Sequence, residues 1–460
     1  MFNPDIQYRC TIIRGKAQKE LDNLLPAYAG MIAEICPCSK DDFNSLFNDK
    51  LSNFIYRNNF NSLNDGHKKT IRNHITEIAG KLFGLYFEKD DLIYESPSNI
   101  KLLEDNDQPA FFKNLCLNFQ FPNGTQKLQT VLDRIKNKIR FKPFHFIISL
   151  LALAKSNELT LTKDEIAYYV LNAKKVLQGK VDVKTVLKVI NQDRQKGIIK
   201  KIENTSRNTQ HIREQLNLLE LANLITIDSN YIILNSQEID IIQLFISENT
   251  KPLSFDIYSY DLNNEEQKLK MYADWAEYFG QIAIKNQSLL ATKLPYPVPV
   301  QTKSVSKQIN TTVLGDQGED FIFNLEKERV GKTHPRLVNK IQLVGKQRGL
   351  GYDVLSVEAA ENQKEPEFAR FIEVKSTIRI TEPDLNDPNW LDTINLTRKE
   401  WIAAKQYRNA YNIYRVYFTP KKIVTRKINN PFEKNEKDII QVIPTMYRMD
   451  FNSKSIDLEY

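Results

Sequence analysis

Three prolines stand in alternate positions between Lys293 and Val300, in the run Lys-Leu-Pro-Tyr-Pro-Val-Pro-Val. Proline has no backbone N–H to donate and its ring clashes with the preceding helical turn, so this run excludes both a helix and a central strand. A polar stretch, residues 301–312, follows it. We therefore predict a linker over residues 291–313, stiff at first and then flexible, which divides the chain into two parts.

The composition is that of a globular chain with several domains. Hydrophobic residues make up 41% of the 460 residues, which is enough to bury more than one core. The longest apolar run, from Phe146 to Ala154, is too short to cross a bilayer. The N-terminal residues lack the basic and then apolar pattern of a signal peptide. We therefore expect a cytoplasmic protein with no membrane partner.

The part before the linker divides near residue 140. Residues 1–140 combine helical patterns, over 16–35 and 67–87, with an aromatic, loop-rich stretch. We predict a mixed, mostly helical domain there that takes part in DNA recognition. Residues 141–290 have a different pattern and are predicted to form a DNA-binding region of their own.

The pattern of residues 141–290 is typical of winged-helix units. Helices are predicted over residues 144–155, 162–173, 183–196 and 212–222, and strands over residues 224–228 and 231–235. Thr162 and Glu165 fit a capping box at the start of the second helix. The two strands form a hairpin around Ser229 and Asn230. In a winged helix, such a hairpin contacts the DNA backbone while a helix enters the major groove.

Basic residues are concentrated in the same region. Between Leu171 and Gln215, eleven Lys and Arg residues stand against four Asp and Glu residues, an excess equal to the net charge of +7 of the whole chain. Such a stretch is either a solvated face or a surface for a polyanion, and its position favours DNA phosphates. The predicted contacts are Lys174, Lys175, Lys184, Lys188, Arg194, Lys196, Lys200, Lys201, Arg207 and Arg213. Winged-helix units also bind proteins, so this alternative stays open.

The part after the linker, residues 314–460, begins with an amphipathic helix that is predicted to end at Gly331. Glu319 and Glu326 are seven residues apart on this helix and lie on nearly one face. A strand entered through glycines follows and carries Asp353. The sequence therefore places carboxylates on a helix and at the start of a strand.

The next predicted strand, residues 370–377, carries charged residues among apolar ones. Glu373 and Lys375 alternate with Ile372 and Val374, so both charged side chains point to one face. Charges on an otherwise apolar strand are costly unless something requires them. A hard divalent cation would require them, because Mg²⁺ binds a few carboxylates together with water and substrate phosphate.

These residues predict a site for phosphodiester hydrolysis. Asp353 and Glu373 would bind Mg²⁺, and Glu319 would complete the metal site from the helix. Lys375 would orient the attacking water, assist its deprotonation or stabilise the developing charge on the phosphate.

The order of these motifs resembles the PD-(D/E)XK nuclease superfamily, and residues 314–420 resemble the NO VEIN C-terminal domain family. The motifs are Gly315-x-x-Gly-Glu319, Glu326-x-x-Arg329, Gly351-Tyr-Asp353-Val-Leu-Ser356, Phe371-Ile-Glu-Val-Lys-Ser-Thr377, Leu396-Thr-Arg-Lys-Glu400-Trp and Tyr414-Arg-Val-Tyr417. The resemblance implies an α/β, restriction-endonuclease-like αβββαβ domain that hydrolyses DNA with Mg²⁺, for which Mn²⁺ can substitute. Tyr352 stands where the superfamily has proline before the aspartate.

Several nearby residues have two interpretations. Glu326 could be a site residue or the partner of Arg329, which lies three residues along the helix. Glu400 could face the site, although Thr397 and Glu400 fit a capping box. Lys405 and Gln406 are further candidates on the same helix.

The run Gly331-Lys-Thr333 looks like the end of a phosphate-binding P-loop. Glu326 occupies the position of its first glycine, so the motif is incomplete. We therefore expect no ATP requirement.

The whole chain is thus predicted to be multidomain, with a mainly α N-terminal region containing winged-helix units and a C-terminal nuclease domain. It resembles a type II restriction endonuclease, and its separate reading and cutting modules suggest type IIS. The expected partners are double-stranded DNA, a second copy in a transient homodimer on DNA, and a separate cognate DNA methyltransferase. Two alternatives remain: a modification-dependent or antiphage defence nuclease, and a DNA-binding protein with an inactive nuclease fold.

Overall fold

The computed structural model describes residues 3–12, 18–203, 205–281, 287–293, 311–347, 350–359, 365–387, 390 and 392–442. The chain forms two compact units. Unit 1 consists of Met1–Gly318, Lys375–Ile394 and Arg415–Thr425, and unit 2 consists of Glu319–Val374, Asn395–Tyr414 and Arg426–Tyr460. Strands β9 (Ala369–Ile378) and β10 (Tyr411–Phe418) begin in unit 2 and end in unit 1. Most of the predicted linker, residues 294–310, lies outside the described residues.

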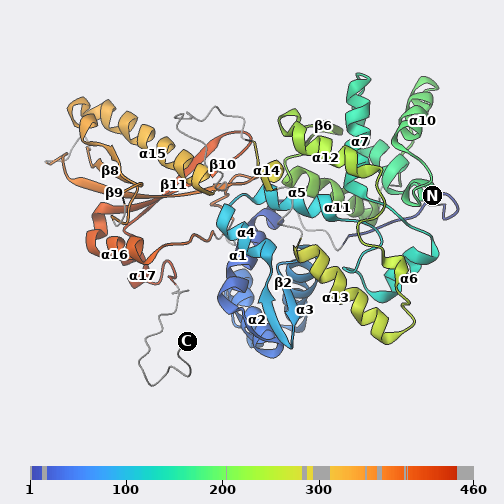
Figure 1. Ribbon diagram of the computed structural model, residues 1–460. Helices are drawn as coiled ribbons and strands as arrows, with labels where there is room; N and C mark the ends of the chain where they lie inside the picture. Colours follow the sequence, from blue (N-terminus) through green and yellow to red (C-terminus); the bar gives the residue numbers. More distant parts are fainter. Residues whose placement is uncertain are drawn as a thin grey trace, which may run out of the picture. The chain divides into compact units, whose positions relative to one another are not determined.

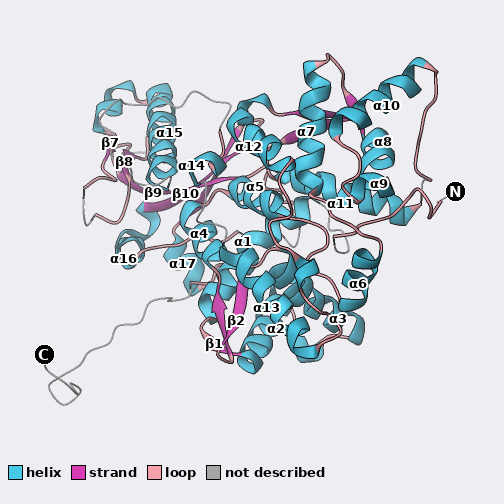
Figure 2. Ribbon diagram, turned by 45° about the vertical axis from the view of Figure 1, so that its right-hand side comes forward, coloured by secondary structure: helices cyan, strands magenta, loops and turns pink. Residues whose placement is uncertain are grey.

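Helices make up most of unit 1 (Figure 2). Before residue 140 they are α1 (Gln18–Ile35), α2 (Lys40–Tyr56), η1 (Phe60–Ser62), α3 (Asp65–Asn73), η2 (His74–Leu82), α4 (Pro97–Asp105), α5 (Gln108–Asn118) and α6 (Leu128–Lys136). Strands β1 (Cys38–Ser39), β2 (Tyr86–Lys89) and β3 (Leu92–Glu95) form a small antiparallel sheet in the order β1-β3-β2. The helix predicted over residues 67–87 therefore ends at Leu82 and gives way to a strand, because Gly84 adopts a φ of 61° that helices exclude.

Between residues 141 and 290, unit 1 contains counterparts of the four predicted helices and two predicted strands, together with elements that were not predicted. They are α7 (Pro143–Ser156), β4 (Leu161–Thr162), α8 (Lys163–Glu165), η3 (Ile166–Leu171), α9 (Lys174–Leu177), α10 (Val183–Gln195), α11 (Ser206–Leu221), β5 (Ile225–Asp228), β6 (Tyr231–Leu234), η4 (Ser236–Glu238), α12 (Ile239–Asn249), η5 (Ile257–Ser259), α13 (Glu265–Gln281) and α14 (Gln287–Leu290). The predicted hairpin is confirmed, with Asp228 paired to Tyr231. The sheet order is β4-β6-β5.

Local sequence explains why these helices begin where they do. Thr162 and Glu165 form the predicted capping box, in which each side chain accepts a hydrogen bond from the backbone N–H of the other residue. The helix α7 is buried along almost its whole length, as its apolar sequence predicts. It packs against α10, which was predicted, and against α12, which was not, so the three helices share one core.

The C-terminal elements form a five-stranded sheet with helices on both sides (Figure 1). They are α15 (Thr311–Thr333), η7 (Pro335–Lys340), β7 (Gln342–Leu343), β8 (Val354–Val357), β9, α16 (Arg398–Tyr407), η8 (Arg408–Ala410), β10, β11 (Ile423–Asn429) and α17 (Pro431–Glu436). The strand order is β11-β10-β9-β8-β7, and β7, β8 and β9 are antiparallel neighbours. The helix α15 lies on one side of the sheet and α16 on the other (Figure 1).

The prediction that the helix ends at Gly331 is wrong, because α15 continues to Thr333. A glycine within a helix costs only about 1 kcal/mol relative to alanine, so it need not end one. Pro335 sets the end instead, because the residue before a proline avoids the helical conformation, and His334 has φ −136° and ψ 72°. None of the described helices has the length and apolar character needed to cross a membrane.

Candidate active site

Asp353 stands where the chain enters β8, between β7 and β9. Its backbone N–H donates to the carbonyl of Ile372 on β9 at 2.8 Å, and its own carbonyl accepts from the N–H of Val344 at 2.7 Å. Its carboxylate also reaches β9, because Oδ2 accepts from the backbone N–H of Val374 at 2.8 Å. These hydrogen bonds fix the backbone and the carboxylate of Asp353 against the strand that carries Glu373.

Glu373 lies beside Asp353 at the end of the ladder between β8 and β9. The last paired residues are Val354 and Ile372, and the N–H of Asp353 donates to the carbonyl of the same Ile372. The carboxylate of Asp353 accepts from the N–H of Val374, so Asp353 contacts the residues on both sides of Glu373. Glu373 is only 3% exposed. The structure thus brings two of the predicted carboxylates together.

Glu319 approaches the same place from α15. A Cβ atom added to Gly345 would lie 2.9 Å from Cδ of Glu319 and 3.1 Å from Oδ1 of Asp353. Both carboxylates therefore lie against Gly345, and that of Glu319 occupies the place where a side chain of residue 345 would begin. Carboxylate oxygens are hard donors, so an arrangement of this kind suits a hard cation.

Tyr411, on β10, is a further residue whose electrostatic environment includes these carboxylates. It is fully buried, and its hydroxyl donates to the carbonyl of Gly351 at 2.9 Å. Burial raises the pKa of Tyr411 well above its usual value, and the negative charges of Glu373, Glu400 and Asp353 raise it further. The hydroxyl thus stays protonated. The residue precedes the motif at Tyr414, and its sequence carries no signal of this role.

Lys375 lies on β9, two residues after Glu373, and is half-buried. Alternate residues of a strand point to the same face, so the side chains of Lys375 and Glu373 leave the strand in the same direction. The intervening Val374 points the other way and is buried. The predicted alternation of charged and apolar side chains is therefore present in the strand.

The donor set fits Mg²⁺. Among the described residues, no group of three or more His, Cys, Asp or Glu side chains is preassembled in a metal-binding geometry. Mg²⁺ does not require such a cage, because it retains several waters and binds through one or two carboxylates and a substrate phosphate. Glu319 and Asp353 already supply hard oxygen donors side by side at Gly345, and Asp353 also contacts the strand that carries Glu373.

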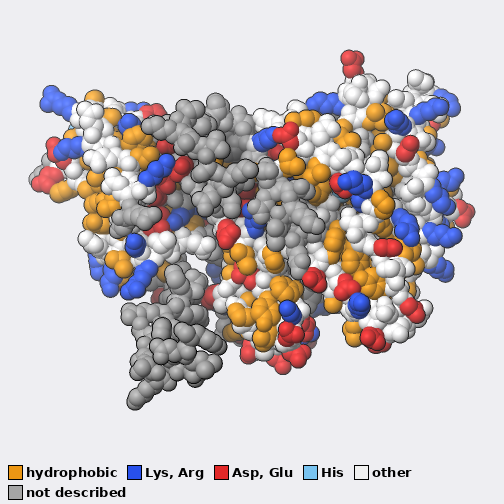
Figure 3. Space-filling model, viewed as in Figure 1, with side chains coloured by type: hydrophobic (Ala, Val, Ile, Leu, Met, Phe, Trp, Pro, Cys, Tyr) orange, Lys and Arg blue, Asp and Glu red, His pale blue; other side chains and the backbone are white. Residues whose placement is uncertain are grey.

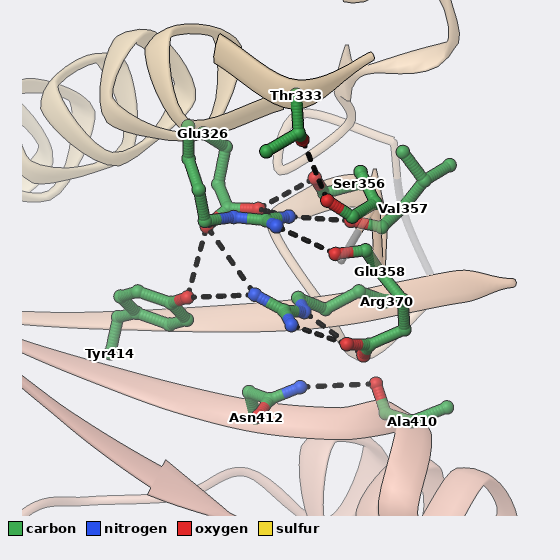
Figure 4. A network of polar contacts seen from close by, with 11 residues as sticks. Glu326, Thr333, Ser356, Val357, Glu358, Arg370, Ala410, Asn412 and Tyr414 are labelled. Carbon is green, nitrogen blue, oxygen red and sulfur yellow. Dashed lines mark hydrogen bonds and ion pairs between the residues drawn. The ribbon is translucent and has the colours of Figure 1, made fainter. Parts of the chain in front are cut away.

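Glu326 lies in a separate polar network between α15 and the sheet (Figure 4). Its carboxylate is 1% exposed and accepts hydrogen bonds from Arg329 at 2.6 and 3.0 Å. The hydroxyls of Ser356 on β8 and Tyr414 on β10 also donate to it, at 2.6 and 3.0 Å. Arg370 completes the network with an ion pair at 3.8 Å. Glu326 thus joins the helix to two strands.

Electrostatics keep Glu326 ionised despite its burial. Burial alone would raise its pKa, but hydrogen bonds from Arg329 and Ser356 and the positive charges of Arg329 and Arg370 outweigh this effect and lower the pKa. The pKa of Glu358, which accepts from Arg370, is lowered for the same kind of reason. The network is therefore a buried set of charges that compensate one another.

Glu400 forms the predicted capping box at the start of α16. Its backbone N–H donates to Oγ1 of Thr397 at 3.3 Å, and its Oε2 accepts from the N–H of Thr397 at 3.0 Å. The negative charge of Glu400 also raises the pKa of Tyr411, as the charges of Glu373 and Asp353 do. On the same helix, Lys405 lies 5.7 Å from the ring centre of Phe432 and Gln406 is exposed.

Part of the basic stretch forms an exposed face on α10. Lys184 and Lys188 are exposed and four residues apart, so they lie on one side of the helix. Val186, Leu187 and Ile190 are buried on the other side. Lys175, Lys196 and Arg213 are also exposed. Figure 3 shows Lys and Arg side chains gathered over the part of unit 1 that contains α10.

Other members of the basic stretch contact neighbouring residues of unit 1. Arg194 donates from Nε and Nη2 to the two carboxylate oxygens of Glu165, at 2.6 and 2.7 Å, and from Nη2 to the carbonyl of Thr160. Lys174, Lys200 and Lys201 contact the carbonyl of Pro4, the ring of Tyr168 and the carboxylate of Asp164, respectively. The side chain of Arg207 lies outside the described residues.

Comparisons with known proteins match both parts of the chain. Residues 318–428 match the family described as protein NO VEIN, C-terminal, as the sequence motifs predict. Residues 2–276 match the family described as restriction endonuclease BpuJI, N-terminal. A search of curated proteins found no match.

A solved structure is similar to the N-terminal part. It is the crystal structure of pyrene- and phenanthrene-modified DNA in complex with the BpuJ1 endonuclease binding domain. The sequences are 46% identical, and the match covers 61% of this chain and 100% of that chain with a TM-score of 0.57. Because the N-terminal family match spans more than half of the 460 residues, this chain belongs to the restriction endonuclease BpuJI N-terminal family.

Proposed function

We propose that this protein is a restriction-type DNA endonuclease that hydrolyses phosphodiester bonds with Mg²⁺. The observation that carries this proposal is the meeting of the Glu319 and Asp353 carboxylates at Gly345, beside the strand of Glu373. Carboxylate oxygens are the ligands that Mg²⁺ prefers, and it binds through one or two of them together with a substrate phosphate.

Each residue has a defined part in the reaction. Asp353 and Glu319 would hold the metal through oxygen atoms, and Glu373 would bind it or a water attached to it. When bound, Mg²⁺ would neutralise the phosphate and lower the pKa of the attacking water. Lys375 would hold that water and stabilise the negative charge that develops on the phosphate. Tyr411 would keep the entry to β8 in place through the carbonyl of Gly351.

Unit 1 would bind double-stranded DNA. Membership of the BpuJI N-terminal family supports this role, and the similar solved structure is a complex with DNA. The order helix, strand, helices, hairpin, with the sheet order β4-β6-β5, fits a winged helix in which α10 faces the major groove. The exposed Lys184 and Lys188 on α10 would then contact phosphates.

The order α15, β7, β8, β9, α16, β10 fits the αβββαβ core of restriction-type nucleases. One such site cuts one strand, so duplex cleavage would use two copies in a transient homodimer on DNA. Reading and cutting by separate parts of the chain would displace the cut from the bound sequence, as in type IIS enzymes. A separate methyltransferase would protect the host DNA.

Digestion of plasmid DNA tests the proposal. The full chain is incubated with methylated and unmethylated plasmid in Mg²⁺ or in EDTA, alongside Asp353→Asn. The matched control is Glu328→Gln, because Glu328 is an exposed acid on α15 that pairs with Lys332. We expect discrete fragments that require Mg²⁺ from the wild type and from the control, and none from Asp353→Asn.

Other outcomes identify the alternatives. Cutting of modified DNA alone would identify a modification-dependent nuclease. DNA that is retarded in a gel but never cut, in Mg²⁺ or Mn²⁺, would refute the proposed hydrolysis and leave a DNA-binding protein with an inactive nuclease fold.

A further inference from the structure

The strand that carries Glu373 and Lys375 extends past them into unit 1. Two residues after Lys375, the hydroxyl of Thr377 donates to the carbonyl of Asn106 at 3.0 Å, between α4 and α5. The backbone N–H of Ile378 donates to the same carbonyl, also at 3.0 Å. Residues 375–394 and α4–α5 belong to the same compact unit, so these contacts are internal to unit 1.

The chain after β9 is held in a second place, on α1. The backbone N–H and the hydroxyl of Thr381 donate to Oδ2 of Asp22, at 2.9 and 2.6 Å. Arg379 donates from Nη2 to Oδ1 of Asn23 at 2.7 Å and to the hydroxyl of Thr381 at 2.8 Å. Its Nε lies 3.5 Å from Oδ2 of Asp22, so a buried ion pair supports the hydrogen bonds.

These contacts, made by residues 377–381 with Asp22, Asn23 and Asn106, are called here the β9 clamp. Its groups are removed from water, since Asp22 is fully buried and Arg379 is 3% exposed. Breaking one contact would leave a buried polar or charged group without its partner. Several hydrogen bonds to Asp22, Asn23 and Asn106, which are far away in the sequence, therefore fix the position of residues 377–381.

We propose that the β9 clamp positions the catalytic strand, which makes Thr377 and Thr381 positioning residues for the reaction. This inference rests on the proposed function. A strand rises about 3.3 Å per residue, so Lys375 is only about 7 Å from the first clamped residue. A shift at Thr377 is transmitted along an extended, hydrogen-bonded strand to Lys375 and Glu373. Catalysis is sensitive to such shifts, because a misplacement of about 1 Å can lower a rate about 100-fold.

The clamp could instead serve only the stability of unit 1. A role in positioning differs from a role in stability in one respect: it affects the chemical step after DNA is bound. The experiment must therefore separate DNA affinity, the order of β9 and the cleavage rate at saturating DNA.

The test uses the full chain with the double variant Thr377→Val/Thr381→Val, which keeps side-chain shape and removes two hydroxyl groups. Thr377→Ser/Thr381→Ser restores the hydroxyl groups and serves as the rescue. The matched control is Thr125→Val, because Thr125 is buried in the same unit and its hydroxyl donates to Asn123 at 2.6 Å, away from β9.

Three quantities are measured for each protein. These are the DNA dissociation constant in EDTA, the hydrogen exchange of backbone amides in residues 369–378, and the single-turnover cleavage rate in Mg²⁺ with saturating DNA. For the valine double variant we expect unchanged DNA affinity, exchange in β9 that is faster by about tenfold, and cleavage slower by about tenfold. The serine variant and Thr125→Val should behave as the wild type in all three.

The other outcomes overturn the proposal. Unchanged exchange and cleavage in the valine variant would show that the clamp does not position the strand. A loss of DNA affinity equal to the loss of cleavage would assign the clamp to the stability of unit 1. A wild type that never cuts DNA would refute the proposed function, and exchange in β9 would still decide whether the clamp orders the strand.

Discussion

The carboxylate of Asp353 accepts a hydrogen bond from the backbone N–H of Val374, the residue between Glu373 and Lys375, at 2.8 Å. This contact joins the start of β8 to the strand that carries the other two motif residues. It occupies one lone pair of Oδ2 and leaves Oδ1 directed toward Gly345. The side chain is thus oriented through Oδ2, while Oδ1 lies on the side of the Glu319 carboxylate.

Replacing Asp353 by asparagine should abolish cleavage and spare folding. The amide keeps the shape of the side chain and can still accept from Val374, but it removes the negative charge that would bind the metal. We expect the cleavage rate to fall by at least about 10³-fold, a loss typical of a missing charge-stabilising group. Single-turnover digestion measures this effect, and DNA binding in EDTA should remain within twofold of the wild type. Substantial residual cleavage would remove Asp353 from the metal site.

Adding a side chain at Gly345 provides a steric test of whether Glu319 belongs to the same site. In Gly345→Ala the new Cβ would lie 2.9 Å from Cδ of Glu319, so that carboxylate must move away. Because the far end of a flexible side chain can give way, we expect the melting temperature to change little while cleavage falls by about tenfold or more. Gly315→Ala is the matched control, because nothing lies within 4 Å of its added Cβ. Equal cleavage by both alanine variants would argue against a role for Glu319.

The side-chain positions that can be predicted from the sequence are those that follow from the local period of a helix or strand. Alternation places Glu373 and Lys375 on one face of β9 because a strand has a period of two. The carboxylate of Glu319 and the hydroxyl of Tyr411 come from a helix and a distant strand, and no local pattern determines that they meet Asp353. Glu319 was predicted from its place on the preceding helix and from the family resemblance, whereas nothing in the sequence predicted Tyr411.

The same distinction between local and tertiary contacts applies to Glu326. Its local partner, Arg329, is predictable from their spacing of three residues on one helix. Its partners Ser356 and Tyr414 lie on β8 and β10, so the choice between a surface pair and a buried network depended on tertiary packing. The β9 clamp was not predictable either, because it joins Asp22 to residues more than 350 positions later in the chain.

Tyr411→Phe should slow cleavage without unfolding the protein. The substitution removes the hydrogen bond to the carbonyl of Gly351, which holds the residues that precede β8. We expect this loss to lower the free energy of unfolding by about 1 kcal/mol. We expect the cleavage rate to fall by about tenfold. Since burial and the neighbouring carboxylates raise the pKa of Tyr411, its ionisation should add no step to the pH–rate profile at neutral pH. An unchanged rate would assign Tyr411 to packing alone.

Glu326→Gln should destabilise the protein by about 3 kcal/mol, because it removes the buried carboxylate that pairs with Arg329 and lies 3.8 Å from Arg370. Thermal or denaturant unfolding measures this loss. Glu328→Gln on the same helix is the control and should be neutral, because its pair with Lys332 is exposed.

The same network predicts how stability depends on pH. The pKa values of Glu326 and Glu358 are lower in the folded protein than the ordinary value near 4.5, so their contribution is fully present above about pH 4.5. It is lost as the pH falls through the lowered values and protons neutralise the carboxylates. We expect the melting temperature of the wild type to drop below about pH 4.5, and Glu326→Gln should drop less steeply. Equal slopes would place the acid-sensitive groups elsewhere.

Lys184→Ala and Lys188→Ala should weaken DNA binding without changing stability. Each lysine that contacts a phosphate releases about one counter-ion, so removing it should lower the slope of log affinity against log salt by about 1. Binding titrations at several salt concentrations measure this slope. Lys89→Ala is the control, because Lys89 is exposed at the end of β2, outside the basic stretch. Unchanged salt slopes in both lysine variants would place the DNA-binding surface away from α10.

Arg194→Ala should differ from both lysine variants, since it removes the bidentate hydrogen bond with Glu165 and therefore lowers the melting temperature.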